Sequence, residues 1–419
     1  MRIAKRRRGG KCVKVVHINA VYKYGSTGRS LMELNEDLNH LGVESHCACS
    51  RTYGCPGVYQ IGDEKSIKLH GLFSRLSGKQ GYFSKQNTKK LLRYIDSLSP
   101  DVVHLHNLHA NYVHLPMLLS YLAKKDIATV IMLHDCWFFT GKCMHYTTQG
   151  CYKWETHCEN CPQIHEGNNS WFFDRTKSVH EDRIRLFQAI PRLAIVGISD
   201  WVTNECRRSP IAKNAKITKR VYLWIDLDKF RPVNADKKRA ELGLTDKFVI
   251  LGVAEQWGNP KGLDRFLHLA TQISPEKQIV LVGNPAPDVE LPDNVLCVGK
   301  TSSQEELAEF YSLADVFVTF SYQETFGKVS AEAIACGTPV VCYNSTACPE
   351  LVGKNCGIVV EKTDENGIFE AVNEIQRNGK AQYSEQCVRF ANENFSRQKL
   401  TREFIEIYEE LEACKAEKR

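Results

Sequence analysis

The sequence has no long hydrophobic run. None of its apolar segments approaches the roughly 18 residues that cross a membrane as a helix, so no membrane span is expected in the 419 residues. The first apolar segment, residues 13–19, is too short and too polar for the core of a signal peptide. The 17 cysteines are odd in number and most lie singly in apolar segments, which argues against a disulfide framework. These features predict a cytoplasmic protein.

The sequence also has no acidic residue before Glu33. The basic residues that precede it are Arg2, Lys5, Arg6, Arg7, Arg8, Lys11, Lys14, Lys23 and Arg29. Removing these nine from the 55 basic residues leaves 46 against 49 acidic ones, so the net charge of +6 arises at the N-terminus. Such a segment either contacts anionic lipid, at about 1 kcal/mol per basic residue, or remains a solvated tail. We therefore expect a peripheral contact with the inner face of a membrane as one alternative. Because the excess is confined to this segment, no nucleic-acid partner is expected.

The remaining composition is that of a globular protein, with 43% apolar and 25% charged residues. The length suggests two domains. Apolar, β-branched segments alternate with helical ones, which predicts an α/β fold with parallel sheets. The predicted strands cover residues 13–19, 100–106, 128–133, 192–199, 248–254, 278–283, 295–299, 314–320, 340–343 and 356–360.

The most informative stretch is residues 321–340, which runs from one predicted strand through a short helix to the next. Its loop, residues 324–328, lies at the carboxyl end of a strand and opens the helix, where free N–H groups and the helix dipole favour a phosphate. Gly327 allows close backbone approach, and Lys328 adds a cation. Glu324 and Glu332 stand eight residues apart on either side of this helix start. Carboxylates at these places can accept hydrogen bonds from vicinal sugar hydroxyls.

Two strand ends in the first half also carry candidate residues. The strand at 13–19 runs into a glycine loop with Gly25 and Gly28, which is either a phosphate-accommodating turn or a plain tight turn, because it is not a full G-x-G-x-x-G. The strand at 128–133 delivers His134 to the edge where open α/β sheets place ligands. A structural histidine that bonds the strand end is the alternative.

The string Glu324, Glu332, Ala333, Gly337, Pro339 and Val340 resembles the signature of the retaining glycosyltransferases of family 4. The resemblance implies the GT-B fold, in which two Rossmann-like domains face each other across a cleft and a C-terminal helix returns to the first domain. It implies an acceptor domain at residues 1–230, with residues 396–419 packing back on it. The nucleotide-sugar domain then covers residues 231–395.

The resemblance also assigns roles to individual residues. It implies that His134 and Glu324 are the catalytic residues beside the donor sugar. The implied donor-binding residues are Gly28, Lys261, Gly299, Thr301, Thr325, Phe326, Gly327, Lys328 and Glu332. The phosphate-clamping arginine of the family is missing, and Glu255 or Gln256 stands in its place. A carboxylate there repels phosphate unless it is turned away.

The activity implied is transfer of a sugar, with retention, from a UDP- or GDP-sugar to a glycan or lipid-linked acceptor, in polysaccharide or glycoconjugate biosynthesis. No catalytic metal is expected, because lysines and a helix dipole can stabilise the leaving phosphate. The alternative class is a non-catalytic module that binds a nucleotide sugar or nucleic acid. A further alternative keeps the fold with phosphorylase or epimerase chemistry.

A cysteine-rich loop follows His134. Cys143, Cys151, Cys158 and Cys161 have the spacing C-x7-C-x6-C-x2-C, which suits a structural zinc ion held by four thiolates. The alternative is four reduced thiols packed under the aromatic residues of the same loop. Cys136, next to Asp135, is expected to pack rather than to bind metal.

Overall fold

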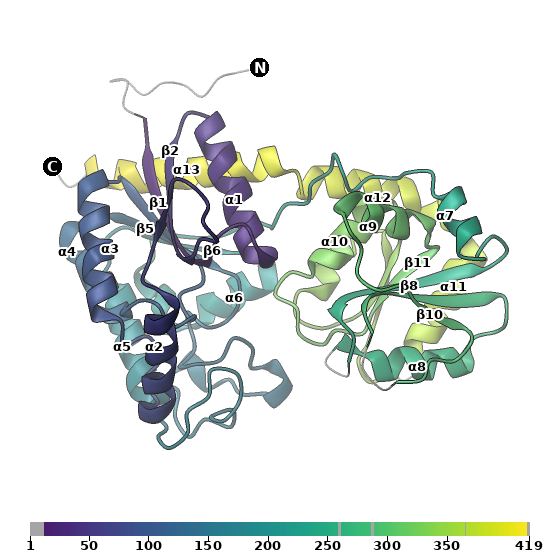
Figure 1. Ribbon diagram of the computed structural model, residues 1–419, viewed down its shortest axis with the longest axis horizontal. Helices are drawn as coiled ribbons and strands as arrows, with labels where there is room; N and C mark the ends of the chain where they lie inside the picture. The colour runs from purple at the N-terminus through teal and green to yellow at the C-terminus, as the bar shows by residue number, and fades with distance from the viewer. Residues whose placement is uncertain (1–11, 259–260, 286–288, 365, 417–419) are drawn as a thin grey trace. The chain divides into compact units, whose positions relative to one another are not determined.

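The computed structural model describes residues 12–258, 261–285, 289–364 and 366–416 (Figure 1). The chain divides into two compact units, Met1–Val221 with Leu400–Arg419, and Tyr222–Lys399. These divisions lie nine residues before and four residues after the boundaries expected at 230/231 and 395/396. Six of the N-terminal basic residues, Arg2 to Lys11, lie outside the described residues.

The first unit is built on a seven-stranded parallel sheet with the order β3-β2-β1-β4-β5-β6-β7. Its strands are β1 (Lys14–Val21), β2 (Glu44–Arg51), β3 (Val58–Gln60), β4 (Val102–Leu105), β5 (Ala128–Leu133), β6 (Leu193–Gly197) and β7 (Ile217–Arg220). Its helices are α1 (Gly25–His40), α2 (Glu64–Ser77), α3 (Lys85–Leu98), α4 (Leu115–Lys125), α5 (Thr176–Gln188), α6 (Asp200–Arg208) and α13 (Arg397–Ala416). Every residue of β4, β5 and β6 is buried, as the continuous apolar runs of a two-sided parallel sheet require.

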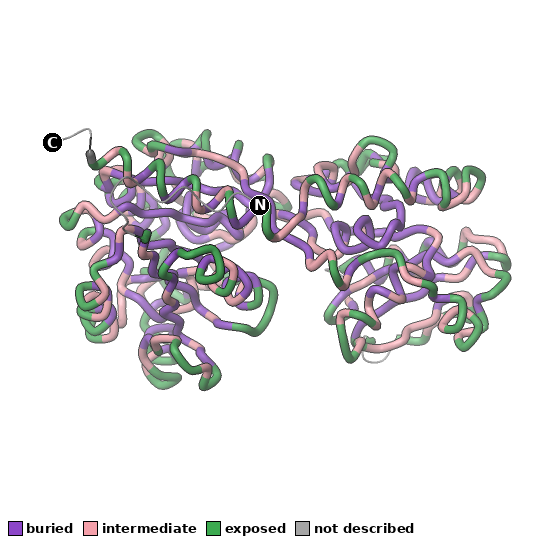
Figure 2. The backbone as a smooth tube through the Cα atoms, turned by 90° about the horizontal axis from the view of Figure 1, so that it is seen from above, coloured by how far each residue is buried: buried purple, intermediate pink, exposed green. Residues whose placement is uncertain are grey.

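The second unit has a six-stranded parallel sheet with the order β10-β9-β8-β11-β12-β13. Its strands are β8 (Phe248–Gln256), β9 (Lys277–Asn284), β10 (Val295–Cys297), β11 (Val316–Thr319), β12 (Val340–Tyr343) and β13 (Gly357–Val360). Its helices are α7 (Asp236–Glu241), α8 (Leu263–Gln272), α9 (Gln304–Leu313), α10 (Lys328–Ala335), α11 (Gly367–Asn378) and α12 (Ala381–Asn394). In each unit, buried segments run through the layer of strands (Figure 2).

The C-terminal helix α13 returns to the first unit, as predicted. Tyr408 on α13 is fully buried, and its hydroxyl lies 2.8 Å from Nδ1 of His104 on β4. Glu412 pairs with the buried guanidinium of Arg192 at 2.6 Å. Burial of the arginine is compatible with its charge because the carboxylate compensates it. The predicted fold class, two Rossmann-like α/β domains with a returning helix, is therefore confirmed.

Among the helices formed by the described residues, none combines the length and apolarity that a membrane crossing needs.

Candidate functional site

Glu324 is fixed in the loop that joins β11 to α10. Its Oε1 accepts a hydrogen bond from the hydroxyl of Ser321 at 2.9 Å and lies 3.4 Å from Nζ of Lys261. Its amide donates to Oγ1 of Thr346 at 3.0 Å, and its carbonyl accepts from the amide of Ala347 at 3.1 Å. The Glu324 side chain is 23% exposed and that of Lys261 is 50% exposed. The carboxylate is thus oriented by fixed partners and remains accessible to a ligand.

The start of α10 has the geometry of an anion-binding helix N-terminus. Gly327, its N-cap residue, has a φ of +92°, which disfavours any residue with a Cβ. Thr325 and Lys328 are half-buried on either side of the turn. The ring of Phe326 is 2% exposed and packs 5.8 Å from the rings of Tyr222 and Phe395. Phe326 therefore anchors the loop through its side chain, and only its backbone is free to meet a ligand.

Glu332 lies inside α10 and is 7% exposed. Its Oε2 accepts a hydrogen bond from the hydroxyl of Tyr311 at 3.1 Å. Burial, reinforced by Glu332, raises the pKa of Tyr311 well above its ordinary value, so the phenol stays a neutral donor. The tyrosine is a partner that the sequence did not indicate.

The loop after β10 holds the predicted base-binding residues Gly299 and Thr301. Gly299 has a φ of +72°, and its carbonyl accepts from the amide of Gly283, at the end of β9, at 2.7 Å. Between the two predicted residues, Lys300 places its Nζ 3.4 Å from Oε1 of Glu255. Lys300 thus pairs with Glu255, which is one of the two residues at the predicted place of the phosphate-clamping arginine, and sequence reasoning missed this lysine.

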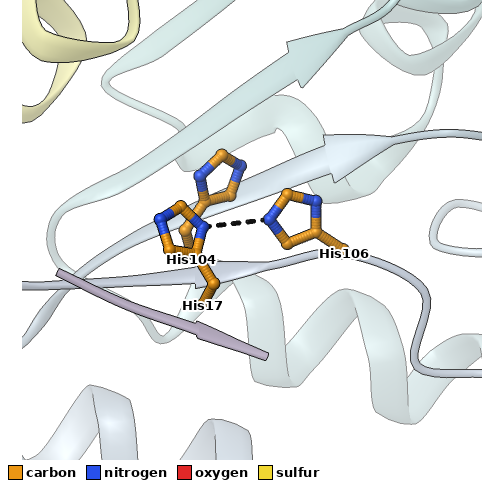
Figure 3. A group of neighbouring side chains, drawn as sticks. All are labelled: His17, His104 and His106. Atoms are coloured by element: carbon orange, nitrogen blue, oxygen red, sulfur yellow. Dashed lines mark hydrogen bonds between the residues drawn. The ribbon is translucent and has the colours of Figure 1, made fainter. Parts of the chain in front are cut away.

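His134, directly after β5, ends a chain of buried imidazoles. Its Nε2 lies 3.2 Å from Nδ1 of His106. Nε2 of His106 in turn lies 3.1 Å from Nδ1 of His17 (Figure 3). His17 is the register partner of His104 on the neighbouring strand. All four side chains are at most 8% exposed. Because each hydrogen bond needs one donor and one acceptor, the tautomers of His17, His106 and His134 are coupled.

Burial keeps these imidazoles neutral. It lowers the pKa of His17 to about 3 and that of His134 to about 4, and it holds the pKa of His104 and His106 well below the ordinary value. One nitrogen from each of His17, His104 and His106 lies within 4.8 Å of the other two. His17 contacts His106 through Nδ1 and His104 contacts Tyr408 through Nδ1, whereas Nε2 of His17 and Nε2 of His104 are buried without a hydrogen-bond partner among the described residues.

Next to His134, Asp135 accepts a hydrogen bond from the amide of Trp137 at 2.8 Å, and its Oδ2 lies 3.0 Å from Nε2 of His109. Gly28 lies in the first turns of α1, and its carbonyl accepts from the amide of Lys23 at 2.9 Å. A Cβ there would lie 3.3 Å from backbone atoms of Tyr22 and Lys23, so this glycine lets α1 approach the end of β1.

The predicted site residues thus fall into three groups. His134 and Gly28 lie in the first unit at the ends of β5 and β1. The remaining predicted donor residues lie in the second unit, around the ends of β8, β10 and β11. The four loop cysteines, Cys143, Cys151, Cys158 and Cys161, lie between β5 and α5 and line one cavity.

Two Rossmann-like units, each with polar and charged residues at the carboxyl ends of its parallel strands, have the architecture of the GT-B fold. The family model described as Glycosyl transferases group 1 matches residues 234–394, and the one described as Glycosyltransferase Family 4 matches residues 27–172. The two matches together span most of the chain, which belongs to glycosyltransferase family 4.

Two curated relatives illustrate the similarity. D-inositol 3-phosphate glycosyltransferase 1 of Catenulispora acidiphila is 36% identical over 141 residues, which are 29% of this chain and 34% of that protein. The D-inositol 3-phosphate glycosyltransferase of Mycolicibacterium smegmatis is 30% identical over 169 residues, 37% of this chain and 39% of that protein. The matched regions span about a third of the length of these relatives.

Solved structures are similar over nearly the whole chain. Sucrose-phosphate synthase of Thermosynechococcus elongatus has a TM-score of 0.66 at 19% identity, covering 96% of this chain and 100% of that one. Alr3699/HepE of Anabaena, solved with UDP, has a TM-score of 0.66 at 14% identity, covering 94% of this chain and 99% of that one. At such identities the likeness establishes the fold.

Proposed function

We propose that this protein transfers a sugar from a UDP- or GDP-sugar to a glycan or lipid-linked acceptor, with retention of the anomeric configuration. The observation that carries the proposal is the carboxylate of Glu324, fixed by Ser321 and Lys261 beside the N-terminus of α10. The Anabaena relative has also been solved in complex with UDP-glucose, which favours a sugar nucleotide as the ligand.

In this proposal the diphosphate binds Lys261, Lys328 and the first amides of α10, where the helix dipole favours negative charge. Glu324 accepts hydrogen bonds from the donor sugar, and Glu332 accepts one from the ribose. The backbone at Gly299 and Thr301 holds the base. These cations and amides stabilise the leaving phosphate, so the reaction needs no catalytic metal.

Retention does not require a glycosyl-enzyme here. A double-displacement site places two carboxyl groups about 5 Å apart at one acetal carbon. Glu332, in contrast, is buried against Tyr311 inside α10. The bond between the anomeric carbon and the phosphate oxygen breaks, and the acceptor oxygen bonds to the same face of that carbon. The acceptor's proton passes to the departing phosphate. His134, as a neutral imidazole, contacts the donor sugar in the transition state.

A ligand screen followed by product analysis tests this function. Thermal stabilisation is measured with UDP-, GDP- and ADP-sugars, since a ligand at 100 times its dissociation constant adds about 2.7 kcal/mol. The best donor is then incubated with glycan and lipid-linked acceptors, and the anomeric configuration of the product is read by NMR. An inverted product would contradict retention. Tight binding with no turnover on any acceptor would favour the non-catalytic alternative.

A lipid-linked acceptor is supported by an exposed apolar surface on the first unit. Leu69, Leu72 and Phe73 on α2 are 39–53% exposed, and the segment 171–173 next to the end of α2 adds three exposed aromatic rings. The amide of Trp171 donates to the carbonyl of Arg75 at 2.8 Å, which joins the two parts. Exposed Lys65, Lys68 and Arg75 accompany them. Aromatic residues with cations suit an anionic lipid interface.

Vesicle binding tests this contact at the inner face of a cytoplasmic membrane. Phe172→Ser should weaken sedimentation with anionic phosphatidylglycerol vesicles at least severalfold, whereas Tyr53→Ser, another exposed aromatic of the same unit, should not. Equal binding of both variants, or none by the wild type, would remove the membrane from the proposal.

All 17 cysteines, each in the described part of the chain, are free thiols, which favours a reducing compartment.

A further inference from the structure

The loop between β5 and α5 is long and has little regular structure. Among its described residues, only two single-turn helices form, at Thr147–Gln149 and Lys153–Glu155. Yet it is anchored at both ends, since the amide of Cys136 donates to the carbonyl of Met144 at 2.9 Å and the amide of Thr176 donates to Asp174 at 2.8 Å. A loop of this length inside a compact unit needs a source of order other than regular secondary structure.

Four of the five cysteines of this loop share one small cavity. Cys143, Cys151, Cys158 and Cys161 all line a space of about 20 Å³, which is enough for a single small atom or ion. Each is half-buried, whereas Cys136 is fully buried and lies away from the cavity. The structure therefore separates the four cysteines of the predicted set from the fifth, which packs as expected.

A backbone amide is directed at one of these sulfur atoms. The amide of Gly141 donates to Sγ of Cys158 at 3.2 Å. Amides that point at sulfur stabilise thiolate over thiol, because a hydrogen bond to the charged form favours it. Partners of this kind orient ligands around a metal ion.

Two buried cations next to the cavity have no carboxylate partner. Nζ of Lys142, 7% exposed, donates only to carbonyls, of Gln163, Ile164 and Glu166. Arg183, 1% exposed, donates to carbonyls of the same loop and stacks 3.7 Å from the ring of Trp137. Within the residues that the structure describes, neither cation forms an ion pair. A buried charge without a counter-charge is costly.

We propose that Cys143, Cys151, Cys158 and Cys161 bind one Zn²⁺ in a closed tetrahedral site that orders this loop. Four thiolates around Zn²⁺ leave two net negative charges, which match the two cations, Lys142 and Arg183. Binding releases the thiol protons to solvent, so four S–H bonds are replaced by four Zn–S bonds. With no open coordination position, the ion is structural. The proposal is independent of the sugar-transfer function.

The four sulfur atoms must move closer together when the ion binds. Among the described residues, no three of these cysteines have their sulfur atoms within 4.8 Å of one another. A tetrahedral site with Zn–S bonds of about 2.3 Å places the sulfurs about 3.8 Å apart. The loop therefore contracts around the ion. Because the loop begins directly after His134 and Asp135, this contraction also fixes the end of β5.

The test is metal analysis of protein purified in reduced form without a metal-affinity tag. Wild-type protein should contain about one zinc per chain, and Cys158→Ser should contain far less. Cys55→Ser is the matched control, because Cys55 is also a half-buried thiol of the first unit and lies outside the loop. It should keep its full zinc content.

Cobalt substitution covers the case in which Cys158→Ser does not fold. Wild-type protein refolded with Co²⁺ should show the absorption of a tetrahedral four-thiolate site, and its removal with a chelator should expose four further thiols to titration. Zinc content well below one, equal zinc in both serine variants, or a native disulfide between Cys143 and Cys161 would each overturn the proposal. Packed reduced thiols would then be the better account.

Discussion

The two strand ends that carry the proposed catalytic residues provide different environments for a side chain. At the end of β5, His134 is 8% exposed and continues a chain of neutral imidazoles. At the end of β11, Glu324 is 23% exposed and touches a lysine and a hydroxyl. Of the 14 histidines in the chain, 13 belong to the first unit, and His268 is the single one of the second.

The difference shows that the end of a parallel strand can hold either a buried imidazole or a partly exposed carboxylate. Burial keeps His134 uncharged, so its properties depend on packing and tautomer. Polar partners hold the side chain of Glu324 in one orientation, so its properties depend on hydrogen bonds. A reaction that separates charge between sugar and phosphate can use both kinds. The following predictions test this contrast, from the largest expected effect to the smallest.

Mild acid should destabilise the first unit far more than the second. Burial lowers the pKa of His17 to about 3 and those of His70, His134 and His180 to about 4. Between pH 6.5 and those values the unfolded chain binds protons that the folded unit excludes. Stability therefore falls with pH by up to about 1.4 kcal/mol per pH unit for each histidine. Hydrogen exchange read by mass spectrometry at about pH 7 and pH 5.5 should show protection lost first in the first unit. Equal losses in both units would contradict the buried neutral state.

Glu324→Gln should reduce sugar transfer at least about tenfold, about 1.4 kcal/mol of barrier, with the fold intact. The amide keeps the shape but removes the charge that Ser321 and Lys261 hold in place. Glu374→Gln, an exposed glutamate on α11, serves as the control and should leave turnover unchanged. Glu332→Gln should reduce transfer to a similar extent, because it removes the charge proposed to accept the ribose. The fold should stay intact, since the amide oxygen can still accept a hydrogen bond from the hydroxyl of Tyr311. Near-normal turnover of both site variants with the true donor would remove the central claim.

His134→Ala should lower kcat about fivefold, about 1 kcal/mol, and change the donor dissociation constant less. The imidazole is expected to act on the sugar in the transition state rather than on the nucleotide. His70→Ala removes another buried imidazole, one that bonds Ser84, and controls for lost packing. If the two variants lose activity only in proportion to unfolding, His134 is a structural residue.

The smallest effect is expected at Gly28, one of the glycines of the two loops. Gly327→Ala should cost about 1–2 kcal/mol, because its φ of +92° lies in the left-handed region. Gly28→Ala should change stability by less than about 0.5 kcal/mol, since better helix propensity offsets contacts of 3.3 Å. Urea unfolding measures both. A larger loss for Gly28→Ala would mean that α1 cannot shift away from β1.

Much of the fold follows from the sequence because buried parallel strands read as continuous apolar runs. The strand predicted at 128–133 has the observed bounds of β5. The strands predicted at 314–320 and 340–343, with the short helix between them, correspond to β11, β12 and α10. Glu324 and Lys328 were found because they lie within one short stretch whose spacing is informative. The region from β2 to α3 carried no comparable motif and was not assigned.

Contacts between distant segments were not predictable in the same way. His17 and His104 lie opposite each other only because β1 and β4 pair in one particular register, which the sequence does not specify. Lys300 was overlooked beside Gly299, although a cation there can neutralise Glu255. For the chain of imidazoles, the sequence offered one signal. The alternation His104-Leu105-His106 places two imidazoles on one side of an extended segment.

The return of α13 also determines the order in which the chain can fold as it is synthesised. Tyr408 is 304 residues from His104, and Glu412 is 220 residues from Arg192. At about 5–20 residues per second, a ribosome takes roughly 10–40 s to produce Tyr222–Lys399 before α13 emerges. During that time the nascent first unit presents the side chains of His104 and Arg192 without their final cover. The second unit, continuous in sequence, can close first, and α13, which is made after it, then completes the first unit.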